Sequence, residues 1–367
     1  MFKDFSEASA ALRGDLPQLE RRGITYHPDV RPRAYAFDAY QTDFALACDA
    51  QPGLVSASNA GIPAFLTTLV DPQVYKILVA PNEMAKIIGE TRKGDWLSTT
   101  AMFPTVERTG EVTSYGDFAT GGRAGLNVFF PQRQAYVFQV IKEWGERELE
   151  LAGLARISWA SEVDEAAAVI LMKFENYTYA FGVAGLQNYG LLNDPNLTAA
   201  LTPAPKANGG VKWINGTTMN ATANEVYADI EQLFVQLVLQ SSGLVKRADK
   251  LVLAMSPVSE AALTITNSFN VNVGDLIKKN FPNLEVMTAI QYGATSASNP
   301  QGNAGGNLVQ LIAPKIEGQD VGYCSFSEKQ RSHPVIRDLS SFRQKVSSGS
   351  WGAIIRQPFA IAQLLGV

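Results

Sequence analysis

The chain has 367 residues, of which 46% are hydrophobic and 18% charged, and its formal net charge is −4. A chain of this length can bury a large core, either in two domains or in one domain with long excursions. The slightly acidic balance argues against a basic surface for specific nucleic-acid binding. The first residues lack the apolar segment of a signal peptide, and no apolar run reaches the length of a membrane span.

Residues 1–60 predict an extended arm rather than a compact unit. Pro28 and Pro32 interrupt both helical and strand periodicity. The arm needs a surface on which to bury its aromatic side chains. These are Tyr26, Tyr35, Phe37, Tyr40 and Phe44. After the arm we expect a short strand over Phe65–Val70 and a helix around Pro81–Thr91, because proline suits the first helical turn.

Residues 102–150 predict a long β-hairpin. Apolar and polar residues alternate on both sides of the glycine-rich turn TGGRAG at 120–125. The two sides of the hairpin have little core of their own, and an isolated two-stranded ribbon is only marginally stable in water. We therefore expect the hairpin to gain its stability by lying on a neighbouring subunit.

A long amphipathic helix is expected from Ser158 to Phe181, although Ser161 is an alternative start. Gly182 is expected to end it, because helices commonly end at a residue with positive φ and glycine adopts positive φ readily. Apolar residues recur at steps of three and four and predict one buried stripe. The stripe consists of Trp159, Val163, Ala166, Ile170, Phe174, Tyr177 and Phe181.

The part of the chain after the loop-like stretch 196–222 predicts helices that alternate with short buried strands, as in a compact α/β region. Asn224 is expected to cap a second amphipathic helix. The buried face of this helix contains Val226, Ile230, Leu233, Phe234 and Leu237. Further expectations are strands at 250–255 and 307–314, a helix from Pro257 to Thr266, and two C-terminal strands around a turn at SSGSWG, 347–352.

The search for catalytic chemistry is negative. His27 and His333 each precede a proline and have no partner at metal-ligand spacing. The phosphate-binding loop and the nucleophile-elbow motif are both missing from the sequence. The acidic residues between 143 and 150 alternate with basic ones, as on a solvated, salt-bridged element. We predict no catalytic residue, no cofactor, no metal ligand and no enzymatic activity.

The two cysteines, Cys48 and Cys324, lie far apart in the sequence. A disulfide between them stays open at this point, although free thiols in a reducing compartment are favoured.

Three stretches carry a family resemblance: FPTVERTGEVTSYGDF, RQAYVFQVIKEWGERELELAG and NYGLLNDPN. Their order and spacing, with an arm before them and a helix–strand region after them, resemble the major capsid proteins of tailed bacteriophages with the Hong Kong ninety-seven-type fold. The resemblance covers about 60–367 and implies an α+β fold. It implies an N-terminal arm (1–60), a peripheral domain (61–101, 151–196 and 314–367), an extended loop (102–150) and an axial domain (197–313). Ser158–Phe181 would be the spine helix, and the strand from Phe342 would complete the peripheral sheet.

The resemblance implies that many copies assemble into the icosahedral head of a tailed phage around packaged double-stranded DNA. The expected partners are the chain itself, in hexamers and pentamers, then scaffolding, portal and decoration proteins, with non-specific contact to DNA and none to a membrane. Assembly would take place in the host cytoplasm. Residues 1–60 lack a long charged helical segment, so we expect no cleaved scaffolding segment there and a separate scaffolding protein. No lysine lies between Lys93 and Lys142, so a covalent crosslink from the hairpin tip is not expected. The alternatives are a cellular nanocompartment (encapsulin-like) shell protein and an α/β hydrolase.

Charged residues of the hairpin are the candidates for intersubunit ion pairs, since they occur in both signs on an element without a core. They are Glu107, Arg108, Glu111, Asp117, Arg123 and Arg133. Charge reversal at Arg123 is expected to lower the assembly yield without unfolding the subunit.

Overall fold

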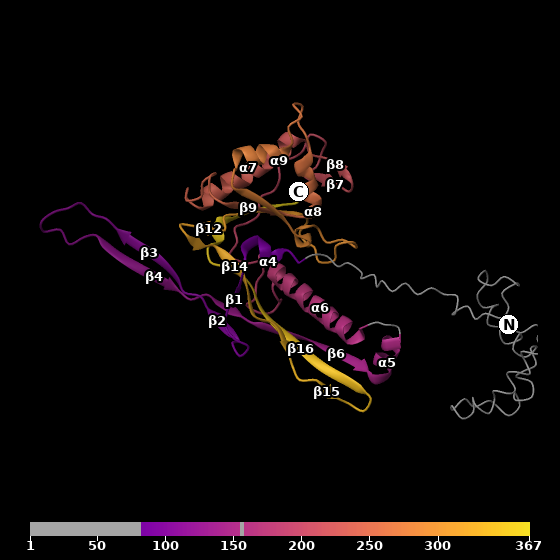
Figure 1. The fold of residues 1–367 in the computed structure, drawn as a ribbon. Coiled ribbons are helices and arrows are strands. Elements are labelled where there is room, and N and C mark those ends of the chain that lie inside the picture. Colours follow the sequence, from indigo (N-terminus) through magenta and orange to yellow (C-terminus); the bar gives the residue numbers. More distant parts are fainter. Residues whose placement is uncertain (1–81, 155–157) are drawn as a thin grey trace, which may run out of the picture. The chain divides into compact units, whose positions relative to one another are not determined.

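The computed structural model describes residues 82–154 and 158–367, which fall within one compact unit, Ile77–Val367 (Figure 1). The expected arm 1–60, the strand Phe65–Val70, His27 and Cys48 lie outside the described residues.

A five-stranded, mainly antiparallel sheet is organised around one long strand, β16. It pairs with β14 on one edge and with β6 on the other. The short strand β1 runs parallel to β14 and forms an edge of this sheet. The bounds are β1 (Glu90–Arg92), β6 (Tyr136–Gly145), β14 (Gly322–Ser332), β15 (Ile336–Arg337) and β16 (Ser341–Ile355).

Helix α6 (Trp159–Phe181) lies along β6 and β16 and covers this sheet (Figure 1). Its bounds confirm the expected helix, with Ser158 at the N-cap and Gly182 at the C-cap. The short helices α4 (Met84–Ile88) and α5 (Glu146–Leu154) pack against it. Helix α4 is shorter than the expected Pro81–Thr91, because Gly89 at φ 82° ends it and Glu90 enters β1.

The predicted apolar stripe of α6 is not its buried face. Ile170 and Tyr177 are 53% and 38% exposed, whereas Ala167, Leu171 and Thr178 are buried. Several residues of the buried side make hydrogen bonds: the Thr178 hydroxyl donates to Ser350 Oγ at 2.8 Å, and the side chains of Glu175 and Asn176 accept from Tyr179 and from the Met84 amide. Apolarity alone predicted the wrong side, because a closely packed helix selects small and hydrogen-bonded residues for its contact face.

A second sheet has four strands in the order β10-β9-β11-β17. Every residue of β9 and β11 is buried, and helix α7 (Ala223–Gln240) packs on β11 and β17. The strand bounds are β9 (Leu251–Met255), β10 (Leu284–Thr288), β11 (Leu308–Ile312) and β17 (Ile361–Leu365). The expected strands at 250–255 and 307–314 are thus confirmed.

Smaller elements complete the second region. They are the hairpin β7–β8 (Ile214–Asn215, Thr218–Met219), helices α8 (Pro257–Glu260) and α9 (Val273–Asn280), and the hairpin β12–β13 (Lys315–Ile316, Gln319–Asp320). Three 3₁₀ turns lie at Ala261–Thr264, Ile290–Tyr292 and Pro358–Ala360. The helix expected from Pro257 to Thr266 is therefore a short α-helix followed by a 3₁₀ turn.

Thr222, and not Asn224, caps α7. Its hydroxyl accepts from the Glu225 amide while the Glu225 carboxylate accepts from the Thr222 amide, which makes a capping box. The signal was present in the sequence as Thr-x-x-Glu, two residues before the chosen asparagine.

The C-terminal tail also differs from expectation. SSGSWG at 347–352 lies inside β16 rather than in a turn, since its small residues face closely packed neighbours: Ser348 and Ser350 are fully buried. The return strand β17 pairs with β11 of the second sheet. Only β14, β15 and β16 of the segment 314–367 join the first sheet.

One hydrophobic cluster extends through both sheets. It includes Met84 of α4, Tyr179 of α6, Trp213 beside α7, and Leu253 and Leu311 in the second sheet. The core therefore continues across the junction between the two sheets.

Candidate assembly surfaces

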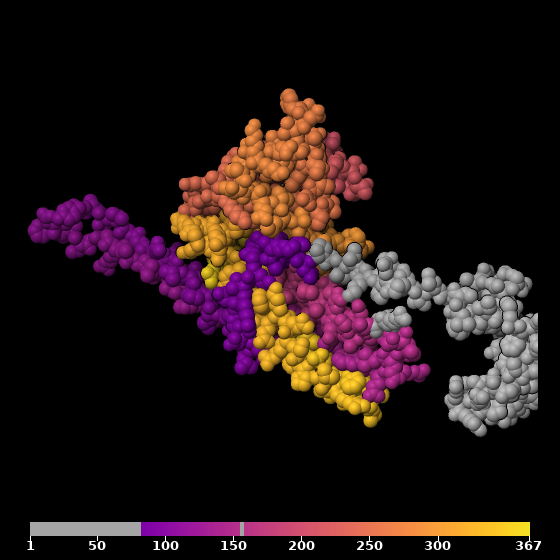
Figure 2. Space-filling view, viewed as in Figure 1, coloured from indigo at the N-terminus to yellow at the C-terminus, as the bar shows by residue number. Residues whose placement is uncertain are grey.

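The extended hairpin consists of two consecutive two-stranded segments. The outer segment pairs β3 (Thr105–Glu111) with β4 (Arg123–Phe129), and the inner segment pairs β2 (Thr100–Met102) with β5 (Gln132–Gln134). Strand β6 and helix α5 belong to the body, so the ribbon is shorter than the expected 102–150. Every residue of β3 and β4 is exposed, and Figure 2 shows the purple atoms of this region uncovered on the face in view.

The register gives the outer ribbon two different faces. Residues directly opposite each other in an antiparallel pair point to the same side, and successive residues alternate. One face carries Val106 opposite Val128 and Arg108 opposite Leu126. This face is largely aliphatic, although all four residues are open to solvent.

The other face of the ribbon is polar except at its base, where Phe129 lies opposite Thr105. Glu107 lies opposite Asn127, whose amide donates to its carboxylate at 3.3 Å, and Glu111 lies opposite Arg123. Three of the predicted contact residues (Glu107, Glu111 and Arg123) therefore share a face, whereas Arg108 lies on the aliphatic one. Within the described residues, no ion pair involves Arg108, Glu111 or Arg123.

The tip of the hairpin, between β3 and β4, exposes three large apolar side chains. Val112 is 99% exposed, Tyr115 is 92% exposed and Phe118 is 99% exposed. Asp117, another predicted contact residue, accepts a hydrogen bond from the Tyr115 hydroxyl at 2.9 Å. Sequence reasoning selected only charges here. The signal that it missed was the pair of aromatic residues, Tyr115 and Phe118, in a loop too far from the body to be buried in its core.

Arg133 corrects the prediction of an intersubunit ion pair at that position. Its guanidinium donates to Asp194 Oδ2 at 2.8 Å and stacks 5.0 Å from the centre of the Tyr189 ring. The Arg133 side chain is only 8% exposed, and the Asp194 side chain is fully buried. The pair therefore ties the base of the hairpin to the turn that follows α6, within one chain.

The stretch NYGLLNDPN forms that turn and caps α6. The amides of Leu191 and Leu192 donate to the carbonyls of Tyr179 and Ala180 at 2.8 and 3.0 Å, and the Asn193 amide group donates to the carbonyl of Phe181 at 2.6 Å. The last carbonyls of a helix lack internal partners, so these bonds satisfy them.

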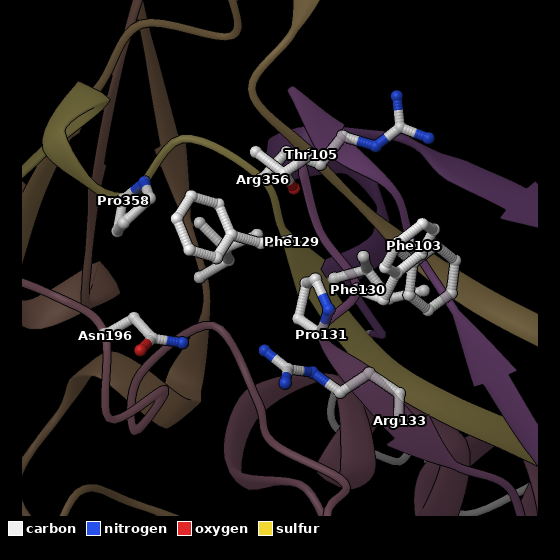
Figure 3. Close-up of a pocket in the computed structure, with 11 residues that line it drawn as sticks. Phe103, Thr105, Phe129, Phe130, Pro131, Arg133, Asn196, Arg356 and Pro358 are labelled. Carbon is white, nitrogen blue, oxygen red and sulfur yellow. The ribbon is translucent and has the colours of Figure 1, made fainter. Parts of the chain in front are cut away.

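A pocket of about 620 Å³ lies at the base of the hairpin. Its apolar lining comes from Phe103, Phe129, Phe130, Pro131 and Pro358, and its polar lining includes Arg133, Asn196 and Arg356. Figure 3 shows the rings of Phe129, Pro131 and Pro358 grouped around it. Phe129 and Phe130 are 55% and 59% exposed, so the pocket presents open aromatic surface.

A carboxylate network joins the buried side of α6 to strands β1 and β14. The Tyr179 hydroxyl is 2.6 Å from Glu175 Oε1 and 2.7 Å from Glu90 Oε1, and Lys329 pairs with Glu90. Burial raises the pKa of Glu175 to about 6, and the nearby Glu90 charge adds to the shift. Burial, together with the Glu175 charge, also raises the pKa of Tyr179.

In 82–154 and 158–367, no group of three or more His, Cys, Asp and Glu side chains could hold a metal ion. No helix in these two ranges is long and apolar enough to cross a membrane. His333 contacts Ser347 Oγ at 3.0 Å and the ring of Trp96, as a structural histidine would.

Solved structures similar to this chain are capsid proteins. The chain is similar to one from the capsid of Myoviridae Phage XM1, with a TM-score of 0.65 and 16% identity over 86% of this chain and 100% of that chain. A chain of the native GTA particle capsid matches with a TM-score of 0.54 and 14% identity, over 85% and 99% of the two chains. A chain from Gordonia phage Cozz matches with a TM-score of 0.53 and 11% identity, over 86% of this chain and 97% of that chain.

At these identities the likeness concerns the fold, which is that of phage capsid proteins and confirms the expected α+β capsid class. A family model described as Pa193 gp26 major capsid protein matches residues 53–366. The chain belongs to this family of major capsid proteins, which are structural components of the virion. No curated protein sequence matches the chain. The family favours a phage capsid over a nanocompartment shell or an α/β hydrolase.

Proposed function

We propose that this major capsid protein assembles with copies of itself into pentamers and hexamers, which build an icosahedral head around packaged double-stranded DNA. The observation that carries the proposal is the outer ribbon β3–β4. All of its residues are exposed, it has an aliphatic face, and its charges lack ion-pair partners within the described residues.

The free energy of burying apolar side chains favours a partner that covers the ribbon. Burying an exposed aliphatic or aromatic side chain contributes roughly 1.5–3 kcal/mol. Val106, Leu126 and Val128 on one face, with Tyr115 and Phe118 at the tip, leave this contribution unused in the isolated chain. A neighbouring subunit that covered the ribbon would recover it, and repeated contacts of this kind stabilise a shell by mass action.

Further partners belong to the same proposal. We propose scaffolding, portal and decoration proteins as the other partners of the chain in the head. The net charge of −4 gives no basic surface for specific DNA binding, so we propose only weak, non-specific contact with the packaged DNA. We place assembly in the host cytoplasm and assign the chain no cofactor and no catalytic step.

Electron microscopy and sedimentation of the purified protein, over a range of protein and salt concentrations, test the proposal. We expect closed particles, or capsomers of five and six copies. The matched control deletes the tip 112–122 and joins β3 to β4 through a two-residue turn. This change leaves the core intact and should reduce particle formation.

A chain that stays strictly monomeric under every assembly condition would contradict the proposal. Particles that contain enzyme cargo and no nucleic acid, when recovered from infected cells, would indicate a nanocompartment shell instead.

A further inference from the structure

We infer that the exposed apolar stripe of α6 is the docking site for a basic amphipathic helix of a second protein. The inference rests on the proposed function, and it gives the scaffolding partner of that proposal a surface and a chemistry. The stripe consists of Trp159, Val163, Ala166, Ile170, Phe174, Tyr177 and Phe181.

Helix α6 is apolar on two sides, and only one of them meets the body. Ala167 and Leu171 are buried on the side that covers the first sheet. On the other side Ile170 is 53% exposed, Trp159 is 39% exposed and Phe174 is 37% exposed. A helix that is apolar all round is normally buried all round, and a continuous apolar surface left open marks an interaction site. The open stripe is therefore an interface whose partner lies outside the subunit body.

The spacing of the stripe fits a helical partner. The pattern repeats after 11 residues, from Trp159 to Ile170 and again from Ile170 to Phe181. Such a repeat corresponds to about 3.67 residues per turn, so the stripe stays close to one side of the helix instead of winding around it. It extends for about 33 Å, and a second helix with apolar side chains at steps of three and four can lie along that whole length.

Aromatic side chains of β6 widen the stripe at its centre. The ring of Phe174 lies 4.6 Å from the ring of Phe138 and 5.9 Å from that of Tyr136, between centres. Both β6 residues are only half-buried, and β6 runs beside α6 (Figure 1). A helix laid on α6 would contact these rings too, and aromatic contacts contribute beyond the area that they bury.

The charge around the start of α6 gives the sign of the partner. Helix α5 packs against α6, and the acids of the two ranges 146–154 and 159–165 are Glu146, Glu148, Glu150, Glu162, Asp164 and Glu165. The one base in these ranges is Arg147. Even with Lys142 and Arg337 paired to two of the acids, this region stays net negative. Lysine or arginine residues that flank the apolar side of the docked helix would complement it.

A second copy of this chain fits the stripe less well than a basic helix. Its α6 would present the same acids, with Lys173 as the single base between Trp159 and Phe181. Charge complementarity thus favours a different protein as the occupant.

Fluorescence anisotropy of a labelled peptide tests the site on the full-length, unassembled chain. The probe is a synthetic helix of about 22 residues, with leucines at steps of three and four and lysines on both flanks of the leucine stripe. Two comparison peptides carry glutamates in place of the lysines, or the same residues in scrambled order. We expect the lysine peptide to bind and to weaken severalfold at high salt. The two comparison peptides should bind at least about tenfold more weakly.

Ile170→Ser removes an apolar side chain from the centre of the stripe. It should weaken binding of the lysine peptide by about tenfold or more, because that side chain is buried on docking. The matched control is Leu239→Ser on α7, where Leu239 is 70% exposed, and it should leave binding unchanged. Both positions are exposed, so both variants should keep the melting temperature of the unmodified chain. Equal binding by Ile170→Ser and the unmodified chain, or of the lysine and glutamate peptides, would overturn the inference.

Photo-crosslinking from position 170 identifies the occupant. Ile170 is replaced by p-benzoylphenylalanine, and we expect crosslinks to the lysine peptide when it is present. In particles formed by a mixture of unlabelled and ¹⁵N-labelled chains alone, we expect no crosslink between the two labels at this position. Crosslinks from 170 to a second copy would give the stripe to that copy and would overturn the inference.

The peptide measurement separates this inference from the proposed function, because binding does not require assembly. A chain that binds the lysine peptide at the stripe but never forms particles would overturn the proposed function and leave the docking site. A chain that forms particles but binds the lysine peptide no better than the scrambled one would overturn the docking site alone.

Discussion

At the scale of single residues, the Tyr179 hydroxyl lies between two carboxyl groups, and its single proton can be donated to only one of them at a time. It is within hydrogen-bond distance of both Glu175 and Glu90, yet a hydroxyl carries one proton. Both bonds exist together only when one carboxyl is protonated and donates to the Tyr179 oxygen. Burial raises the pKa of Glu175 to about 6, so below that pH its carboxyl is protonated and can supply the second proton, while the Lys329 ammonium pairs with Glu90.

This network predicts a pH dependence of stability. The pKa of Glu175 is higher in the folded chain than its ordinary value of 4.5, so the folded state binds more protons between these values. The contribution of protonated Glu175 to the free energy of unfolding is complete below about pH 4.5 and is lost as the pH rises through about 6. The change is about 2 kcal/mol. In urea unfolding of the unassembled subunit, Glu175→Gln should remove this step. An unchanged step would contradict the assignment.

Asp229 is a second buried charge with defined partners. Its Oδ2 accepts from Lys206 Nζ at 2.5 Å and from Trp213 Nε1 at 2.6 Å, and the side chains of Asp229 and Lys206 are 2% and 1% exposed. Lys206→Met would leave the carboxylate buried without its counter-charge. We expect a loss of about 3–5 kcal/mol in the free energy of unfolding.

The matched control for Lys206 is Lys250→Met. Lys250 pairs with Glu285 at the surface, where both side chains are about half exposed or more. This change should cost less than about 1 kcal/mol in the same urea titration. Equal losses of unfolding free energy in Lys206→Met and Lys250→Met would show that burial does not determine how much the Lys206–Asp229 pair stabilises the fold.

At the scale of elements, the turn after α6 depends on backbone approach rather than on side chains. A Cβ on Gly190 would lie 2.1 Å from the carbonyl oxygen of Ala180, and one on Gly182 would lie 2.1 Å from that of Asn188. These glycines let the turn fold back on the helix end. The same turn holds Asp194 against Arg133, so the helix end positions the base of the hairpin.

Gly190→Ala should therefore destabilise the subunit by at least about 2 kcal/mol, because the backbone on both sides of the contact must move. The control is Gly153→Ala in α5, where a Cβ would meet nothing within 4 Å. That substitution should be neutral or slightly stabilising, since alanine favours helix. Thermal unfolding of the two variants compares them directly, and similar melting temperatures would contradict the expectation.

The ribbon gives an element-scale prediction about assembly. Arg123→Glu places two carboxylates opposite each other, at 111 and 123, on the polar face. The site is exposed, so the cost to folding should stay below about 1 kcal/mol. We expect the assembly yield to fall while the melting temperature of the subunit is retained. A variant that unfolds more easily but assembles normally would oppose an intersubunit role for this face.

At the scale of the whole molecule, the described chain combines a continuous core with a ribbon that has none. Large residues such as Trp213, Tyr292 and Trp351 are fully buried in the body, whereas Phe118 at the ribbon tip is almost fully exposed. Monomeric proteins rarely display grouped apolar side chains of this kind. This contrast suits a shell protein, because the buried body stabilises the subunit and the exposed ribbon is free to contact other subunits.

The sequence by itself determined the class of fold, the long helix from Ser158, the buried strands around Leu253 and Leu311, and a hairpin without a core. These follow from local periodicity and from the order of the motifs. Tertiary structure alone decided which side of α6 is buried, that SSGSWG runs inside β16, that β17 joins the second sheet, and that Arg133 pairs within its own chain. The physical reason is common to all four: each depends on what a residue meets across the fold, and close packing of small and hydrogen-bonded groups leaves little trace in the apolar pattern.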